Sequence, residues 1–265
     1  MAYYVHEQRR NYYVEFGGGR PVVLLHGIGN TGRAWSPQIA PLVAAGCRVI
    51  VPDHAGHGAS TRIGAPLGIA DLARDVIALL DHLDIERADI VGLSLGGLIG
   101  IELALGASAR VGRLVLANSF PSTATDAFRA LADQWATTFR AKDGPVVRFE
   151  GSWPFNVSAA FRASDEGTRT WQTWHGIAAM SDGASLAWIA QGVVDYDASG
   201  RLAQIAQPTL IVAGSDDRIS PPALGQAMCE QIRGARFVEI SGAAHISNVD
   251  SARAFNDALT DFLAP

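Results

Sequence analysis

The stretch Val91-Gly92-Leu93-Ser94-Leu95-Gly96-Gly97 decides the fold of this chain. Its first three residues end a short apolar run, residues 88–93, that is typical of a buried parallel strand. After Ser94, apolar residues recur at helical spacing. A chain that passes from strand to helix within three residues crowds its side chains, and Gly92 and Gly96 relieve that crowding. We therefore expect Ser94 on a sharp turn, with its hydroxyl exposed where the first N–H groups of a helix face a reacting group.

A second apolar run, Val22–Leu25, ends in the glycine-containing loop His26-Gly27-Ile28-Gly29. A serine that attacks a carbonyl group produces a tetrahedral intermediate, whose negative oxygen needs two N–H donors about 3 Å away. We predict that Leu95, directly after Ser94, provides one backbone N–H and that Ile28 provides the other. His26 is predicted to hold this loop to a neighbouring one rather than to act as a base.

Two strand-like segments late in the chain are each followed by a polar loop. Residues 208–214 lead into Asp216-Asp217, and residues 236–240 lead into a loop that contains His245. Parallel strands end at the same edge of a sheet, so an acid after one strand and a histidine after the next can both reach Ser94. In such a triad the histidine takes the serine proton, and the carboxylate holds the imidazole in the required tautomer.

Two aspartates compete for the role of the acid in this triad. Asp217 is our choice, because the loop after it turns at Pro221-Pro222 and directs its side chain back to the sheet edge. Asp216 is expected to cap the loop or to pair with Arg218. Asn118, after another predicted strand, occupies an alternative position for the acid, but its amide carries no charge.

Strand-like and helix-like segments alternate along the chain, which predicts an α/β fold with a mostly parallel central sheet flanked by helices. Strands are predicted at 12–16, 48–51 and 111–117, and a helix at 69–83. Between about residues 120 and 200 the buried-strand runs stop, and helix-like patterns carry five of the six tryptophans. We predict a hydrolytic core of residues 1–119 and 201–265, with residues 120–200 inserted as a helical cap that excludes water from Ser94.

Over its whole length the chain resembles an α/β-hydrolase. The motifs that carry this likeness are His26-Gly27, Asp53–Ser60, Gly92–Gly97, Gly214–Asp217 and His245. Within that superfamily it is most similar to the 3-oxoadipate enol-lactone hydrolases, in the segments Gly92–Gly97, Arg113–Asn118, Gly234–Ile240 and Ala244–Asn248. The resemblance implies the triad Ser94, Asp217 and His245 and a small carboxylic ester or lactone as substrate, cleaved through an acyl-enzyme.

Other activities stay open beside the enol-lactonase hypothesis. They are a general carboxylesterase, a carbon–carbon bond hydrolase of ring-cleavage products and, from a different class, a small-molecule receptor with a vestigial triad. An enol-lactone of this kind carries a free carboxylate, so we expect a cation in the pocket. The cations of the predicted cap are Arg129, Arg140, Lys142, Arg148, Arg162 and Arg169. Arg140 is the first choice because apolar residues surround it in the sequence, and Trp135 and Trp153 are further candidates for substrate contacts.

The composition of the 265-residue chain argues against several other classes of protein. With 48% hydrophobic residues it can bury a large core, and its net charge of −5 and lack of a basic run longer than Arg9-Arg10 disfavour nucleic acid or anionic membranes as partners. No run of 18 apolar residues predicts a membrane span, and the first ten residues lack the apolar core of a signal peptide. Cys47 and Cys229 are far apart, as expected for reduced thiols in the cytoplasm. The oligomeric state is left open.

Asp53, His54 and His57 form a pattern that suggests zinc at first sight. The neighbouring Gly56 and Gly58 indicate a turn instead, and a third ligand at suitable spacing is not evident. We therefore predict that the protein uses no metal and no other cofactor.

Overall fold

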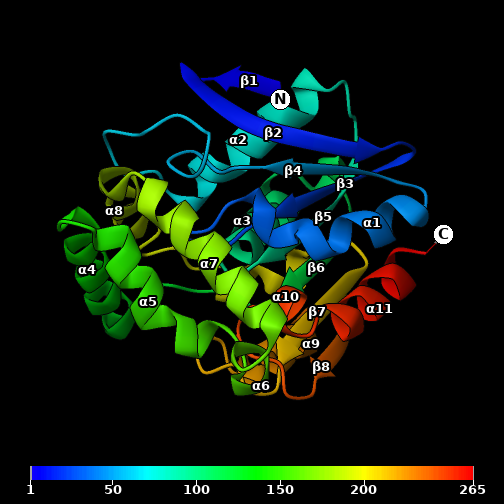
Figure 1. The fold of residues 1–265 in the computed structure, drawn as a ribbon. Helices are drawn as coiled ribbons and strands as arrows, with labels where there is room; N and C mark the ends of the chain where they lie inside the picture. The colour runs from blue at the N-terminus through cyan, green and yellow to red at the C-terminus, as the bar shows by residue number, and fades with distance from the viewer. Residues whose placement is uncertain (1, 265) are drawn as a thin grey trace.

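An eight-stranded sheet forms the centre of the computed structural model, which describes residues 2–264 (Figure 1). Its strand order is β1-β2-β4-β3-β5-β6-β7-β8. β1 and β2 pair antiparallel, as do β2 and β4, whereas the pairs from β4 to β8 are parallel. The strands are β1 (Ala2–His6), β2 (Arg9–Gly17), β3 (Arg20–Leu25), β4 (Cys47–Pro52), β5 (Ala88–Leu93), β6 (Val111–Ala117), β7 (Thr209–Gly214) and β8 (Arg236–Ile240).

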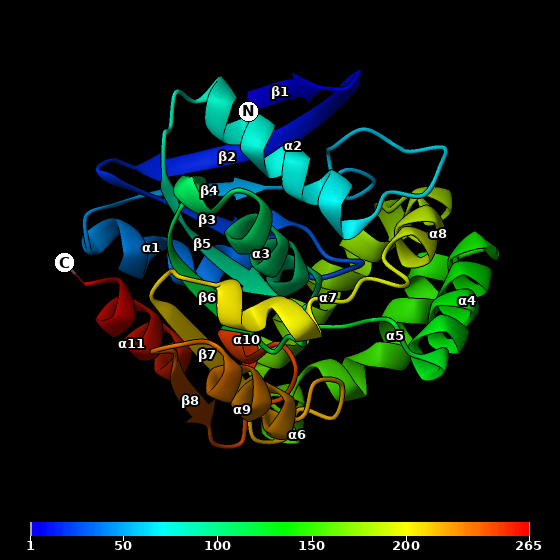
Figure 2. The same ribbon diagram turned by 180° about the vertical axis from the view of Figure 1, so that it is seen from behind.

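Helices cover both faces of this sheet, and the two views of the ribbon separate them (Figures 1 and 2). One face carries α1 (Ser36–Ala44) and α11 (Ala252–Leu263), together with the short helix α10 (Ser247–Asp250). The other face carries α2 (Ile69–His82), α3 (Leu95–Gly106) and α9 (Pro222–Gln231). The predicted α/β fold with a mostly parallel sheet and flanking helices is confirmed.

Most residues of the central strands are apolar because both faces of these strands are buried. In β3, Val22 and Leu24 belong to the hydrophobic cluster under α1 and α11, while Val23 and Leu25 belong to the cluster under α2 and α3. This alternation follows from the period of two residues along a strand. Because both faces are packed, polar residues that are available for chemistry lie beyond the ends of these strands, in the loops.

The predicted segments agree closely with these elements, with differences at their ends. The strand predicted at 12–16 extends over Arg9–Gly17, and the helix predicted at 69–83 ends at His82. The sequence reading did not identify β1, which pairs with β2 at the edge of the sheet. Near its C-terminal end the described chain forms α10 and then, after Ser251, α11.

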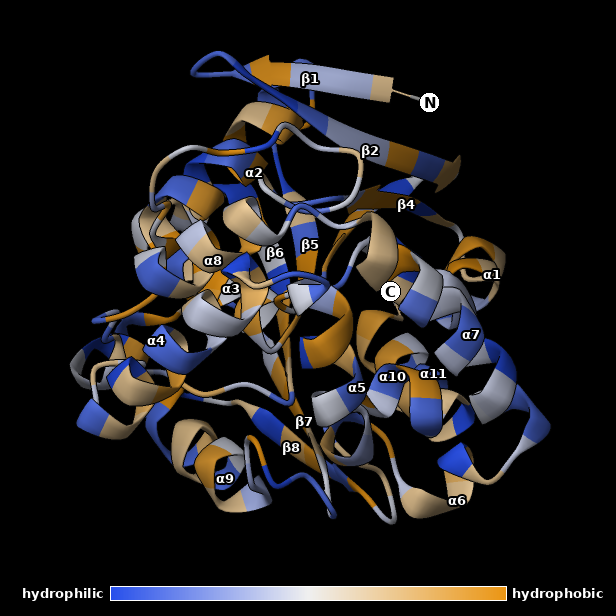
Figure 3. Cartoon of the chain, turned by 60° about the vertical axis from the view of Figure 1, so that its left-hand side comes forward, coloured by the Kyte–Doolittle hydropathy of each residue, from blue (hydrophilic) through white to orange (hydrophobic). Residues whose placement is uncertain are grey.

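The helices α4 to α8 lie within the segment predicted as a cap and gather on one side of the molecule (Figures 1 and 3). Polar and apolar residues alternate along them in the hydropathy-coloured view, as expected for helices with one buried face (Figure 3). The helices are α4 (Asp126–Arg140), α5 (Gly144–Asn156), α6 (Ala159–Arg162), α7 (Asp165–Met180) and α8 (Gly183–Gly192). The division at residues 119 and 200 stays a prediction.

The starts of the cap helices are set by local side-chain chemistry. Thr125, Ser164 and Asp182 precede α4, α7 and α8, and each side chain accepts a hydrogen bond from a backbone N–H in the first turn of its helix. Such caps replace the acceptors that the first N–H groups of a helix lack, and each contributes about 1 kcal/mol. No helix of residues 2–264 combines the length and apolar character that a membrane span requires.

Candidate active site

Ser94 lies on the turn between β5 and α3 in a backbone conformation that few residues adopt. Its φ of 54° and ψ of −114° fall in the region that normally favours glycine. The flanking glycines are required by space: a Cβ on Gly92 would lie 2.1 Å from the carbonyl oxygen of Gly96, and a Cβ on Gly96 would lie 2.0 Å from that of Leu25. The structure therefore has the strained strand-to-helix turn that the sequence predicts.

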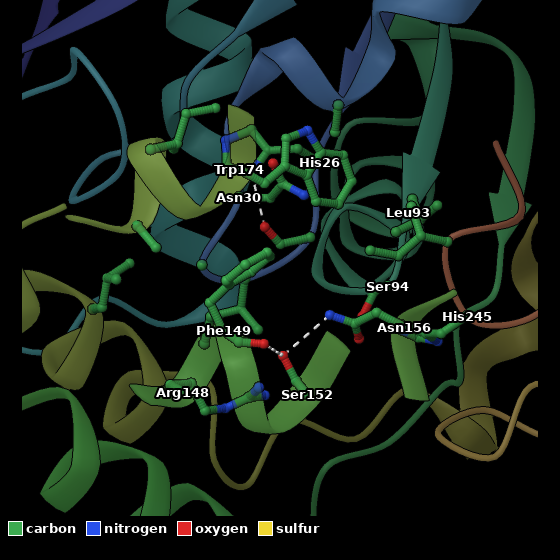
Figure 4. Close-up of a pocket in the computed structure, with 18 of the residues that line it drawn as sticks. His26, Asn30, Leu93, Ser94, Arg148, Phe149, Ser152, Asn156, Trp174 and His245 are labelled. Carbon is green, nitrogen blue, oxygen red and sulfur yellow. Dashed lines mark hydrogen bonds between the residues drawn. The ribbon is translucent and has the colours of Figure 1, made fainter. Parts of the chain in front are cut away.

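Backbone and side-chain hydrogen bonds hold the Ser94 turn from both sides. The Ser94 N–H donates to the carbonyl of Ala117 at 3.0 Å. Its own carbonyl accepts the N–H of Gly97 at 2.9 Å and the hydroxyl of Ser119 at 2.9 Å. The Ser94 side chain is thereby fixed at the carboxyl end of β5 and borders a cavity, where Figure 4 shows it beside His245.

Two backbone N–H groups next to Ser94 are available for a substrate oxygen. Among the hydrogen bonds of residues 2–264, neither the Leu95 N–H nor the Ile28 N–H has an acceptor. The loop that carries Ile28 approaches Ser94 closely, because a Cβ on Gly27 would lie 3.4 Å from Ser94 Cβ. The next N–H in this loop, that of Gly29, is already donated to His57 Nε2 at 3.1 Å. These observations support Leu95 and Ile28 as the oxyanion donors.

Three buried histidines hold that loop in place. His26 Nε2 accepts the backbone N–H of His54 at 3.1 Å, and His54 Nε2 lies 3.0 Å from the His26 carbonyl. Burial lowers the pKa of His54 to about 3 and that of His57 to about 4, and it lowers the pKa of His26 well below 6.5. All three rings are therefore neutral near pH 7 and act as fixed donors and acceptors. The predicted structural role of His26 agrees with these contacts.

Asp53, like the neighbouring His54 and His57, makes hydrogen bonds that hold the surrounding loops. The Asp53 carboxylate accepts the backbone N–H groups of Gly32 at 2.8 Å and Ala59 at 2.9 Å. Within the described residues, 2–264, no group of three or more His, Cys, Asp or Glu side chains is arranged to hold a metal ion.

Asp217 and His245 meet at the end of β7 and β8, as the order of the strands requires. The Asp217 Oδ2 atom lies 2.9 Å from His245 Nδ1, which leaves Nε2 as the ring atom free to exchange a proton with a substrate or serine. Burial raises the pKa of Asp217, but hydrogen bonding and charge interaction with His245, together with Ser220, outweigh burial and lower this pKa to about 2. Asp216 instead is exposed and accepts a hydrogen bond from Ser215 Oγ at 3.0 Å.

Asn118 supports the carboxylate at the position where the sequence suggested an alternative acid. Its side-chain N–H₂ donates to Asp217 Oδ2 at 2.9 Å, and its oxygen accepts the hydroxyl of Ser247 at 2.5 Å. Ser220 donates to the same Asp217 oxygen at 2.7 Å. Sequence reasoning considered Asn118 only as an acid and missed this supporting role, although its position directly after β6 was the available signal.

The cavity beside Ser94 has a volume of about 90 Å³ and lies between the sheet edge and the cap. The core contributes His26, Ile28, Ser94 and His245 to its wall. The cap contributes Trp135, Phe139, Arg148, Phe149, Ser152, Asn156 and Trp174. Figure 4 shows Ser94 and His245 together, with Arg148 and Phe149 on the opposite side of the view. The predicted contact residue Trp135 thus borders this cavity.

Arg148 on α5 is a cation without a counter-ion in the wall of this cavity. Its guanidinium carbon lies 4.5 Å from the centroid of the Trp135 ring, and its Nε atom is buried without a hydrogen-bond partner in residues 2–264. No described carboxylate forms a salt bridge with it, and burial lowers its pKa to about 10. An unpaired cation in a largely apolar pocket creates a site for an anionic group.

Two of the predicted cap contacts, Arg140 and Trp153, do not border this cavity. Arg140 is exposed at the end of α4, donates to Gln191 at 2.8 Å and covers the ring of Trp188. It lies one residue after the buried Phe139, and the turn of about 100° per residue in a helix directs it away from the cavity. The buried Trp153 also does not border the cavity, because its ring packs among the aromatic rings of the cap, namely Phe149, Phe161 and Trp174.

Comparison with known proteins extends the resemblance noted in the sequence. A family model described as alpha/beta hydrolase fold matches residues 20–252. A putative carbamate hydrolase RutD of Variovorax paradoxus is 33% identical over 93% of this chain and 92% of its own length. The 3-oxoadipate enol-lactonase 2 of Acinetobacter baylyi is 34% identical over 93% of this chain and 90% of its own length.

A solved structure shows the same arrangement of the whole chain. The enol-lactonase from Burkholderia xenovorans LB400 superimposes with a TM-score of 0.93 at 28% identity, with 100% of each chain covered. The expected similarity to enol-lactone hydrolases is confirmed, and the similarity to proteins named as carbamate hydrolases is an addition that sequence reasoning did not anticipate.

Proposed function

This chain belongs to the alpha/beta hydrolase fold family, and we propose that it is a serine hydrolase of a small carboxylic ester or lactone that bears a separate anionic group. The observation that carries the proposal is the unpaired Arg148 in the same cavity as Ser94 and His245. The leading substrate is an enol-lactone of the 3-oxoadipate type. A relative named 3-oxoadipate enol-lactonase 2 is similar over 93% of the chain, and a solved structure named enol-lactonase is similar over 100% of it.

The proposed reaction begins with Ser94. Its Oγ attacks the carbonyl carbon while His245 Nε2 takes the hydroxyl proton, and Asp217 stabilises the resulting imidazolium through the 2.9 Å contact to Nδ1. With a pKa of about 2, Asp217 is fully ionised at neutral pH and is available for this role. The negative oxygen of the tetrahedral intermediate is bound by the free N–H groups of Leu95 and Ile28.

The intermediate then collapses to an acyl-enzyme. The bond from carbon to the leaving oxygen breaks as His245 returns the proton to that oxygen. Water, activated by His245 in the same way, attacks the acyl-enzyme and releases the carboxylic acid and the free serine. Apart from water, every step uses side chains and backbone groups of this chain, so no metal or other cofactor is required by this mechanism.

Arg148 gives the proposed site its preference among substrates. A guanidinium that lacks an internal partner gains a charge-assisted hydrogen bond when a carboxylate enters the cavity. A neutral ester of the same shape lacks that interaction. The carbamate hydrolase relatives make a carbamate the second candidate substrate, because they match 93% of the chain at an identity similar to that of the enol-lactonase relative.

The test compares one variant on two substrates. We expect Arg148→Met to lower kcat/KM for an ester with a free carboxylate by about 30-fold or more, the effect of removing a desolvated charge partner, and to leave a neutral ester of the same size almost unchanged. Arg140→Met is the matched control, because Arg140 lies outside the cavity and should affect neither substrate.

Two outcomes would contradict the proposal. An equal loss on anionic and neutral esters would show that Arg148 supports the cap rather than the substrate. Efficient hydrolysis of a carbamate, with anionic esters and lactones left uncleaved, would favour the second candidate instead.

A further inference from the structure

A second cavity also borders Ser94, but His245 does not line it. It has a volume of about 80 Å³, and its wall contains Leu98 of α3 and Phe128 and Leu131 of α4. The two cavities share Ile28, Ser94, Trp135 and Ile219. The mechanism described above places no part of the substrate in the second cavity, although Leu95, one of its oxyanion donors, borders it. The second cavity therefore requires a separate explanation.

The lining of this second cavity is almost entirely apolar. Phe120, Phe128, Leu98, Leu131 and Val193 border it, and no charged side chain does. Phe128 packs edge-on against Phe120 and against Trp135, with ring centroids 6.1 and 5.9 Å apart. Such a wall binds aliphatic groups and disfavours a carboxylate, whose burial without a partner is costly.

The geometry of ester cleavage assigns a side to each half of the substrate. The reacting carbon carries Ser94 Oγ, the oxyanion, the leaving oxygen and the acyl substituent. The oxyanion faces the Leu95 and Ile28 N–H groups, and the leaving oxygen faces His245, which must give it a proton. His245 borders only the first cavity, so the acyl substituent is directed to the second.

We infer that this protein binds its substrate in one orientation, with an apolar acyl group in the second cavity and the anionic group on the leaving-group side near Arg148. This inference rests on the proposed function and narrows its substrate class to esters and substituted lactones with a carboxylate on the alcohol or enol half. For an open-chain ester, the leaving oxygen takes the proton from His245. The product departs from the first cavity as an alcohol that still carries its carboxylate. The acyl group meanwhile stays on Ser94 until water adds to it.

A pair of isomers tests the orientation. The ion 3-acetoxypropanoate carries its carboxylate on the alcohol half, whereas monomethyl succinate has the same atoms with the carboxylate on the acyl half. We expect kcat/KM to be at least tenfold higher for 3-acetoxypropanoate, and we expect Arg148→Met to remove this preference.

The acyl side is tested with a longer chain and a filled cavity. Wild-type enzyme should prefer 3-butanoyloxypropanoate to 3-acetoxypropanoate by about tenfold, since each methylene buried in an apolar pocket adds to transition-state binding. Leu131→Trp should abolish that preference for the longer acyl chain, because the larger side chain fills the second cavity. Leu131 is 37% exposed, so a larger side chain is tolerated there, and Leu224→Trp is the matched control because Leu224 is 40% exposed on α9 and borders neither cavity.

The outcomes separate this inference from the function on which it rests. Equal or better hydrolysis of monomethyl succinate, in an enzyme whose anion preference still depends on Arg148, would overturn the orientation and keep the proposed function. An acyl-chain preference that Leu131→Trp leaves intact would overturn the assignment of the second cavity. Failure of the function itself appears in the earlier test, as an equal loss for anionic and neutral esters.

Discussion

The sheet edge and the cap border one cavity, but they are organised by different rules. At the sheet edge, Ser94, Asp217 and His245 each lie within a few residues of the end of a strand, and their neighbours in sequence constrain them. In the cap, Trp135 and Arg148 lie on two different helices, and only the packing of α4 on α5 brings their side chains together. The comparison teaches that the groups proposed for chemistry are positioned locally, whereas the groups proposed for substrate choice are positioned by tertiary contacts.

Removing the nucleophile should produce the largest effect and tests the sheet edge alone. We expect Ser94→Ala to lower kcat by about 10⁶-fold on any ester, because no other group can form the acyl-enzyme. The variant should fold normally, since alanine keeps the Cβ and loses only the hydroxyl. Measurement of ester hydrolysis together with circular dichroism checks both statements. Retention of more than a tenth of the activity would favour the receptor hypothesis.

The next prediction separates two adjacent carboxylates of the same loop. Asp217→Asn should lower kcat by about 10⁴-fold, since an amide in its place no longer sets the tautomer of His245. Asp216→Asn should have little effect, because that side chain is exposed and contacts Ser215. Steady-state kinetics of the two variants decide this comparison, and the reverse order would move the acid by one residue.

Replacing two tryptophans of the cap by alanine should affect different properties, stability in one case and substrate turnover in the other. Trp153→Ala should lower the free energy of unfolding by about 3–5 kcal/mol, because its buried ring fills the aromatic cluster of the cap. Trp135→Ala should instead lower kcat/KM for an anionic ester by about tenfold, through loss of the contact with Arg148. Urea unfolding and kinetics on both variants distinguish a structural from a substrate-binding role. A substrate-specific effect of Trp153→Ala at unchanged stability would break this division of the cap.

The smallest effect concerns the histidine cluster under the Ile28 loop and appears as a dependence of stability on pH. The pKa of His57 is about 4 in the folded protein and 6.5 in an unfolded chain, so the unfolded state binds the proton first as the pH falls. The folded state should therefore lose about 1.4 kcal/mol per pH unit for this residue between pH 6.5 and 4. His57→Gln should reduce that slope by about one proton in urea titrations at several pH values. An unchanged slope would show that His57 is protonated in the folded protein.

The strand-to-helix turn at Ser94 could be predicted from sequence because its requirements are local. Gly92 and Gly96 are needed wherever a strand turns this sharply into a helix, and their spacing around a serine is visible in the chain. Asp217 and His245 could be predicted for a related reason, since residues after parallel strands share one sheet edge. The supporting role of Asn118 was missed, because its position directly after β6 indicates that it lies at the sheet edge but not which side chain it contacts there.

The sequence by itself determined the fold class and the strand-to-helix turn at Ser94, and it predicted that Asp217 rather than Asp216 serves as the acid of the triad. Those features depend on residue types at fixed spacing within one segment. Only the tertiary structure decided that Arg148, rather than Arg140, faces the cavity and that Trp153 does not. Both arginines lie in helical stretches among apolar residues, and the direction that each side chain takes depends on how the helices of the cap pack, which short-range sequence patterns do not encode.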